Sequence, residues 1–136
     1  MTNGLFYAHS GLRYLILLVG VAALVNSALA LRSERPTNSA DRVLMGAFSG
    51  LLDLQLLLGF AMVVTGILYS ALIGHIAMML LAVVVAHVCS VVARKAPDPR
   101  RAHAMRLAGV LGALVLILGG IMAIGRSVLG SGTPSM

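Results

Sequence analysis

Long runs of apolar residues, separated by short polar segments, dominate the hydrophobic pattern of this chain. The first run covers residues 14–31 and the last covers residues 107–128. Between them, residues 43–93 are almost uniformly apolar, and Asp53 is the one charged residue in that stretch. As a single helix it would measure roughly 75 Å, more than twice the thickness of a hydrocarbon core of about 30 Å. We therefore expect it to fold back on itself within residues 66–74.

Each of the resulting four segments is long enough to cross a bilayer, and a chain inside lipid satisfies its backbone hydrogen bonds as a helix. Polar residues that commonly cap helix N-termini stand where the second and fourth helices are expected to begin. Asn38 or Ser39 can cap the second helix, and Asp98 followed by Pro99 is typical of an N-cap and a first helical position. We predict an all-α membrane protein with four transmembrane helices in an up-down bundle. It would form a single domain over residues 1–136, with helices at about 5–31, 40–68, 72–93 and 99–128.

Composition and charge support this prediction. The chain is 60% hydrophobic and 10% charged, whereas a soluble domain is nearer half apolar and a quarter charged. The net charge of +6 arises mainly from two loops, residues 32–42 and 94–106, which hold eight of the ten lysines and arginines. Such loops are typically cytoplasmic. We expect a bacterial inner-membrane protein with both termini on the outer (periplasmic) side, in contact with lipid and with membrane-protein partners or further copies of itself, and not with nucleic acid.

Two histidines are predicted to lie at the same depth on different helices. His9 lies about 33 Å along the first helix from Leu31, and His75 lies about 27 Å along the third helix from Ala93. Imidazoles that face each other from separate helices can bind the iron of haem b. Arg13, one turn from His9 on the same face, would suit a haem propionate. The alternative is that these side chains only anchor the helix ends among lipid headgroups.

A second polar group is predicted deeper in the bundle. His87 lies about 18 Å along the helix from His75, and we expect its neighbours to be Asp53 or Gln55 in the second helix. An ionisable residue inside a spanning helix is costly and is commonly functional. These three residues suit a quinone headgroup and proton transfer. The alternative is a neutral Asp53 that hydrogen-bonds to another helix. His103, which lies among arginines, is expected in solvent or at lipid phosphates.

Several segments resemble a known group of proteins. They are residues 9–14 (HSGLRY), residues 53–59 (DLQLLLG), residues 75–79 (HIAMM) and the pair at 86–87 (AH). They are similar to small bacterial four-helix integral membrane proteins labelled cytochrome b-like, which share the architecture of the cytochrome b561 proteins.

The resemblance implies haem b held by histidines drawn from His9, His75 and His87, with Arg13 and Gln55 as polar companions. No enzyme activity can be carried over from the resemblance, and whether the chain is an enzyme stays open. The function expected is therefore a membrane-embedded electron-transfer protein or subunit that binds haem b near the outer face and exchanges electrons with quinol. The alternative is a non-catalytic structural or accessory subunit of a larger respiratory or photosynthetic membrane complex.

Overall fold

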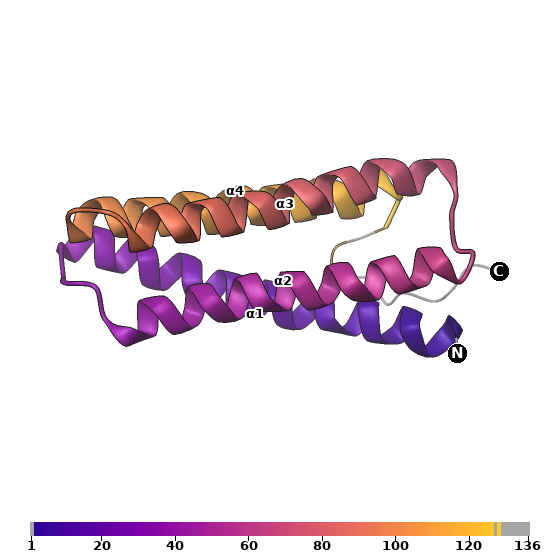
Figure 1. The fold of residues 1–136 in the computed structure, drawn as a ribbon, viewed down its shortest axis with the longest axis horizontal. Helices are drawn as coiled ribbons and strands as arrows, with labels where there is room; N and C mark the ends of the chain where they lie inside the picture. Colours follow the sequence, from indigo (N-terminus) through magenta and orange to yellow (C-terminus); the bar gives the residue numbers. More distant parts are fainter. Residues whose placement is uncertain (1, 127, 129–136) are drawn as a thin grey trace.

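The computed structural model describes residues 2–126 and 128, and all regular secondary structure in this part of the chain is helical. Successive helices run in opposite directions, so that α1 begins at the end of the bundle where α4 ends (Figure 1). This confirms the prediction of an all-α fold with four helices. Their bounds are α1 Thr2–Ser33, α2 Ser39–Val64, α3 Ser70–Arg94 and α4 Pro99–Ala123.

All four helices are long and apolar enough to cross a membrane. Much of their apolar surface faces outward: Leu18 on α1 and Phe60 on α2 are each 67% exposed, and Val84 on α3 is also largely exposed. Large apolar side chains that cover the outside of a bundle on every helix are stable in lipid rather than in water. The fold therefore indicates a multi-pass membrane protein whose outer surface contacts lipid.

Side chains at the helix starts account for where α2 and α4 begin. Asn38 accepts a hydrogen bond from the backbone N–H of Asp41 (3.1 Å), and the Asp41 carboxylate accepts one from the N–H of Asn38 (2.8 Å). This reciprocal pair is a capping box. Asp98 accepts a hydrogen bond from the N–H of Arg101 (2.8 Å), and Pro99 occupies the first turn of α4. The predicted caps at Asn38 and Asp98 are confirmed.

Two helices end earlier than the sequence pattern predicts. α2 ends at Val64 rather than at residue 68, and α4 ends at Ala123 rather than at residue 128. Each end is followed by a glycine with positive φ, Gly66 at +95° and Gly125 at +69°. Glycine adopts this left-handed conformation without steric cost and so ends a helix even where apolar residues continue. Ser127, inside the predicted range, lies outside the described residues.

The helices pack as two hairpins, α1 with α2 and α3 with α4, joined mainly through α1 and α4 (Figure 1). α4 is the most buried helix, and its Val110, Ala113 and Ile117 lie in the core with Phe48 of α2. The α3–α4 contact requires a glycine, because a Cβ atom at Gly109 would lie 2.5 Å from Cβ of Cys89. This close packing holds α3 and α4 together as one unit.

Candidate functional site: a histidine pair between α1 and α3

The structure brings His9 of α1 and His75 of α3 together at one end of the bundle. Their ring centroids lie 6.4 Å apart and their ring planes are inclined at 71°. The prediction that these histidines lie at a common depth on different helices therefore agrees with the geometry. A metal bound about 2.0–2.1 Å from one nitrogen of each of two imidazoles would hold the ring centres roughly 6 Å apart. The observed separation matches that arrangement.

His75 is oriented by a contact to the neighbouring helix. Its Nδ1 lies 3.0 Å from the backbone carbonyl oxygen of Gly120 on α4. Because a carbonyl oxygen only accepts hydrogen bonds, Nδ1 must carry the proton and donate it. In the neutral ring this leaves the Nε2 lone pair available, and metal-bound histidines are held by the same type of hydrogen bond. The contact therefore fixes the orientation of the His75 ring and leaves Nε2 free of a proton in the neutral ring.

α2 positions His9 in two ways. The side-chain Nε2 of Gln55 donates a hydrogen bond to the backbone carbonyl oxygen of His9 (2.9 Å). One turn further along α2, Gly59 faces the His9 ring so closely that a Cβ atom there would lie 3.3 Å from Cε1 of His9. Nδ1 of His9 and Oε1 of Gln55 are both buried and have no hydrogen-bond partner among the described residues. Buried polar atoms normally have hydrogen-bond partners, so two such atoms without partners are consistent with a site that binds an additional molecule.

Arg13 lies one turn along α1 from His9, on the face that was predicted. Only 9% of the residue is exposed. Its Nη2 donates a hydrogen bond to the Tyr14 hydroxyl (2.9 Å), and its guanidinium lies 4.7 Å from the centre of the Tyr14 ring. Arg13 is also close enough to act electrostatically on His9. It therefore provides a positive charge beside the histidine pair.

The deeper polar group is only partly as predicted. Nε2 of His87 lies 2.8 Å from Oδ1 of Asp53, so α3 and α2 do bring these two side chains together. Gln55 does not join them, because it is turned toward α1 and bonded to His9. The side chains of His87 and Asp53 are each 48% exposed. They form an outward-facing polar pair on a surface that is otherwise apolar.

His103 is not where the sequence pattern placed it. It is fully buried rather than in solvent or among headgroups, and its Nε2 donates to the backbone carbonyl oxygen of Arg35 (3.0 Å). The connection between α1 and α2 folds over it. In the same connection, Arg35 donates to the buried Asp41 carboxylate (2.7 Å), which also accepts a hydrogen bond from Asn26 (2.7 Å). The hydrogen bond to Asp41 raises the pKa of Arg35.

The histidine pair provides two possible metal donors from two helices. Within residues 2–126 and 128, no three or more histidine, cysteine, aspartate or glutamate side chains converge on a metal position. Two opposed histidines are sufficient for haem, because the porphyrin supplies the remaining ligands. The residues His9 and His75 therefore fit a haem group. No family model matches the chain, and no curated protein or solved structure is significantly similar to it.

Proposed function

We propose that this chain is a membrane-embedded electron-transfer protein, or a subunit of one, that binds haem b through His9 and His75. The observation that carries the proposal is the 6.4 Å separation of the two rings, which lie on different helices. The hydrogen bond from His75 to Gly120 supports it, since it leaves one ring nitrogen available as a ligand. The resemblance to cytochrome b-like proteins is consistent with this site.

Each neighbouring residue has a defined part in the proposed site. Gly120 fixes the ring orientation and tautomer of His75 through its carbonyl oxygen. Gln55 holds the α1 backbone at His9, and Gly59 leaves room for the His9 ring against α2. Arg13 provides the positive charge that a propionate requires. Bound haem would supply reversible one-electron transfer, with the partly buried His9 and His75 as the residues that hold its iron.

The distribution of positive charge supports one orientation of the bundle in the membrane. Most of the lysines and arginines gather at one end of the bundle, because residues 32–42 and 94–106 comprise the α1–α2 and α3–α4 connections with the adjoining helix ends, and both lie at that end (Figure 1). Positively charged connections are retained in the cytoplasm. We place the histidine pair near the periplasmic face of a bacterial inner membrane, with both termini outside.

Quinol is the proposed partner in electron exchange, with Asp53 and His87 as the residues that bind its headgroup. The support is their half-exposed position within the apolar outer surface of α2 and α3. His87 lies seven residues before the end of α3 at Arg94, which is about 10 Å along the helix and within reach of the hydrocarbon layer. A carboxylate and an imidazole can accept the protons that quinol oxidation releases.

Visible spectra of the purified protein test the haem assignment. The protein is produced with an ample haem supply, purified in mild detergent and recorded in its oxidised and dithionite-reduced forms. We expect a Soret band that is lost in His9→Ala and in His75→Ala. His87→Ala is the matched control and should keep the band. Asp53→Asn should keep it too, but should slow reduction of the protein by a soluble quinol.

The outcomes of these measurements distinguish haem-dependent electron transfer from the accessory-subunit function. A wild-type protein that is folded but has no Soret band would refute haem binding and favour the accessory-subunit alternative. A band that survives in both His9→Ala and His75→Ala but disappears in His87→Ala would move the ligand assignment to the deeper site. Unchanged quinol reduction in Asp53→Asn would remove the quinol part of the proposal and leave the haem part standing.

A further inference from the structure

A hollow with a positively charged lining lies at the opposite end of the bundle from the histidine pair. It is formed by the connection between α1 and α2, the first turn of α2, the end of α3, the connection between α3 and α4, and the first two turns of α4, and it has a volume of about 420 Å³. Its polar lining residues are Thr37, Arg42, Arg94, Asp98 and Arg106. Nothing in the proposed electron-transfer function uses this hollow.

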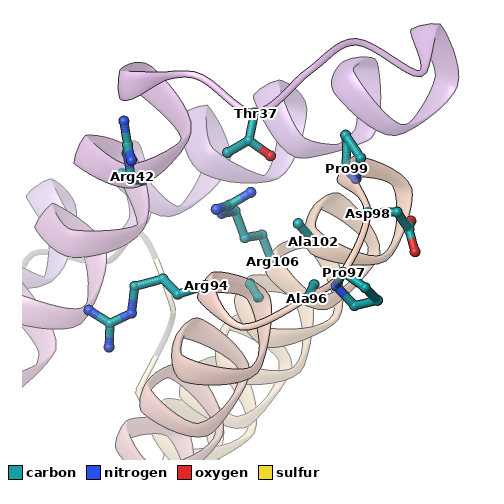
Figure 2. Close-up of a pocket in the computed structure, with 10 residues that line it drawn as sticks. Thr37, Arg42, Arg94, Ala96, Pro97, Asp98, Pro99, Ala102 and Arg106 are labelled. Atoms are coloured by element: carbon teal, nitrogen blue, oxygen red, sulfur yellow. The ribbon is translucent and has the colours of Figure 1, made fainter.

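Arg106 is the unusual residue of the hollow. It belongs to α4 and is 3% exposed, yet its Nη1 has no hydrogen-bond partner among the described residues. Figure 2 shows its guanidinium directed into the space beneath Thr37, whereas Arg42 and Arg94 stand at the side of the hollow. Burial of a guanidinium without a full set of partners is costly. A ligand that accepts a hydrogen bond from Nη1 would account for an arginine that is buried in this way.

The nearby carboxylates are already engaged. Both oxygens of Asp41 accept hydrogen bonds, from Arg35, Asn26 and the backbone of Asn38. Asp98 accepts a hydrogen bond from the N–H of Arg101 as the cap of α4. Neither carboxylate is hydrogen-bonded to Arg106, although the charge of Asp41 offsets part of the cost of burying it, and the lining itself holds three arginines and one aspartate. The hollow therefore has an excess of positive charge, and the N-terminus of α4 adds the positive end of a helix dipole.

We infer that the hollow lined by Arg106, Arg42, Arg94 and Thr37 binds a phosphate group. Guanidinium groups pair with phosphate oxygens through parallel hydrogen bonds, which a single halide ion cannot make. Arg106 forms the floor of the site. Arg42 and Arg94 line the side of the hollow and are exposed, so their flexible side chains can turn toward a bound group, and the Thr37 hydroxyl adds a further donor.

The phosphate has two possible sources, an anionic lipid headgroup and free phosphate or a phosphate monoester. The hollow is larger than a bare phosphate needs, and it lies at the end of the helices where headgroups would be found. Basic pockets between transmembrane helices on the cytoplasmic side are known to hold anionic lipid headgroups. Both sources share the chemistry that Arg106 recognises, and the experiment distinguishes them.

The test compares binding of defined probes to the full-length protein in neutral detergent. One arm titrates inorganic phosphate and follows thermal stability. The other arm adds short-chain phosphatidylglycerol, with phosphatidylcholine as the reference, and counts bound lipid by native mass spectrometry. We expect saturable binding in at least one arm. Phosphate binding would identify a free phosphate site, and binding of phosphatidylglycerol alone would identify a lipid site.

Arg106→Gln should weaken that binding by about 30-fold or more, since it removes the buried member of a charge-assisted pair. Arg101→Gln is the matched control, because Arg101 is an exposed arginine of the same helix that does not line the hollow. It should bind like the wild type. If Arg106→Gln does not fold, the double variant Arg42→Gln/Arg94→Gln replaces it, with the same expectation of weaker binding.

Three results would overturn the inference: no saturable binding of either probe, equal loss in Arg101→Gln and Arg106→Gln, or unchanged affinity in the folded pocket variants. A ligand-free measurement adds an independent check. Without ligand, Arg106→Gln should melt at or above the wild-type temperature, because it removes a buried charge that Asp41 offsets only in part. A haem spectrum that is unchanged in Arg106→Gln would keep this test separate from the proposed electron-transfer site.

Discussion

The buried carboxylate of Asp41 ties the connection between α1 and α2 to both helices, and its replacement by asparagine is the most informative change to stability. Its two oxygens accept four hydrogen bonds, two from Arg35 (2.7 and 2.9 Å), one from the Asn26 side chain (2.7 Å) and one from the backbone N–H of Asn38 (2.8 Å). Asparagine keeps one acceptor oxygen and places an NH₂ group where the other oxygen stood. Two of the four bonds are therefore lost.

The size of the effect follows from that loss. Hydrogen bonds to charged groups contribute about 1.5–3 kcal/mol each, so losing two costs about 3 kcal/mol. The Arg35 side chain is 28% exposed and water can replace part of its lost contact. The cost therefore falls at the lower end of the roughly 3–5 kcal/mol found when a buried ion pair is broken. For a chain of this length that corresponds to a fall in melting temperature of roughly 10 °C.

Thermal melting in a mild detergent, followed by circular dichroism, measures this effect for Asp41→Asn. The control is Asp98→Asn, because Asp98 is exposed and caps α4 through one hydrogen bond. Asparagine caps helices as well as aspartate does, so this control should change stability by less than about 0.5 kcal/mol. Equal melting temperatures for the two variants would refute the reasoning, since the buried network would then contribute no more than an exposed cap.

Two further changes test the packing of α4. Gly109→Ala should destabilise the protein by about 1–3 kcal/mol, because the new Cβ would clash with Cβ of Cys89 at 2.5 Å. Gly46→Ala is the control. Its new Cβ meets nothing within 4 Å, so the melting temperature should stay unchanged or rise slightly. His103→Ala should cost about 2–4 kcal/mol, because it opens a cavity at a fully buried side chain and leaves the backbone carbonyl of Arg35 without its donor. Melting of either variant at the wild-type temperature would contradict the close packing of α4 against α3 and the α1–α2 connection.

The helices and their starts could be predicted because they depend on local properties of the chain. A run of apolar residues long enough to cross a bilayer forms a helix whatever surrounds it, because lipid offers the backbone no other hydrogen-bond partners. The caps at Asn38 and Asp98 are equally local, since each side chain bonds to an N–H three residues ahead. The ends of α2 and α4 were predicted less well, because hydropathy does not report the backbone conformation of Gly66 and Gly125.

The candidate site was partly predictable for the same reason. The depths of His9 and His75 follow from counting residues along straight helices, and the structure places the rings 6.4 Å apart. Counting residues along a helix does not show which connection folds over which helix. His103 therefore looked exposed among arginines, although the segment around Arg35 covers it completely. The buried Arg106 likewise looks like any other arginine of a cytoplasmic loop until α4 is packed against its neighbours.

Asp53 and Gln55 show most clearly where local information ends. The sequence alone determines that both lie on α2 at nearly the same depth, because rise per residue depends only on helix geometry. Two residues are also separated by roughly 200° around an α-helix, so the side chains point in opposite directions. Only the tertiary packing of α1 and α3 on either side of α2 decides that Gln55 meets His9 and Asp53 meets His87. Rotation about the helix axis depends on the side chains that interdigitate between helices, and no single segment contains that information.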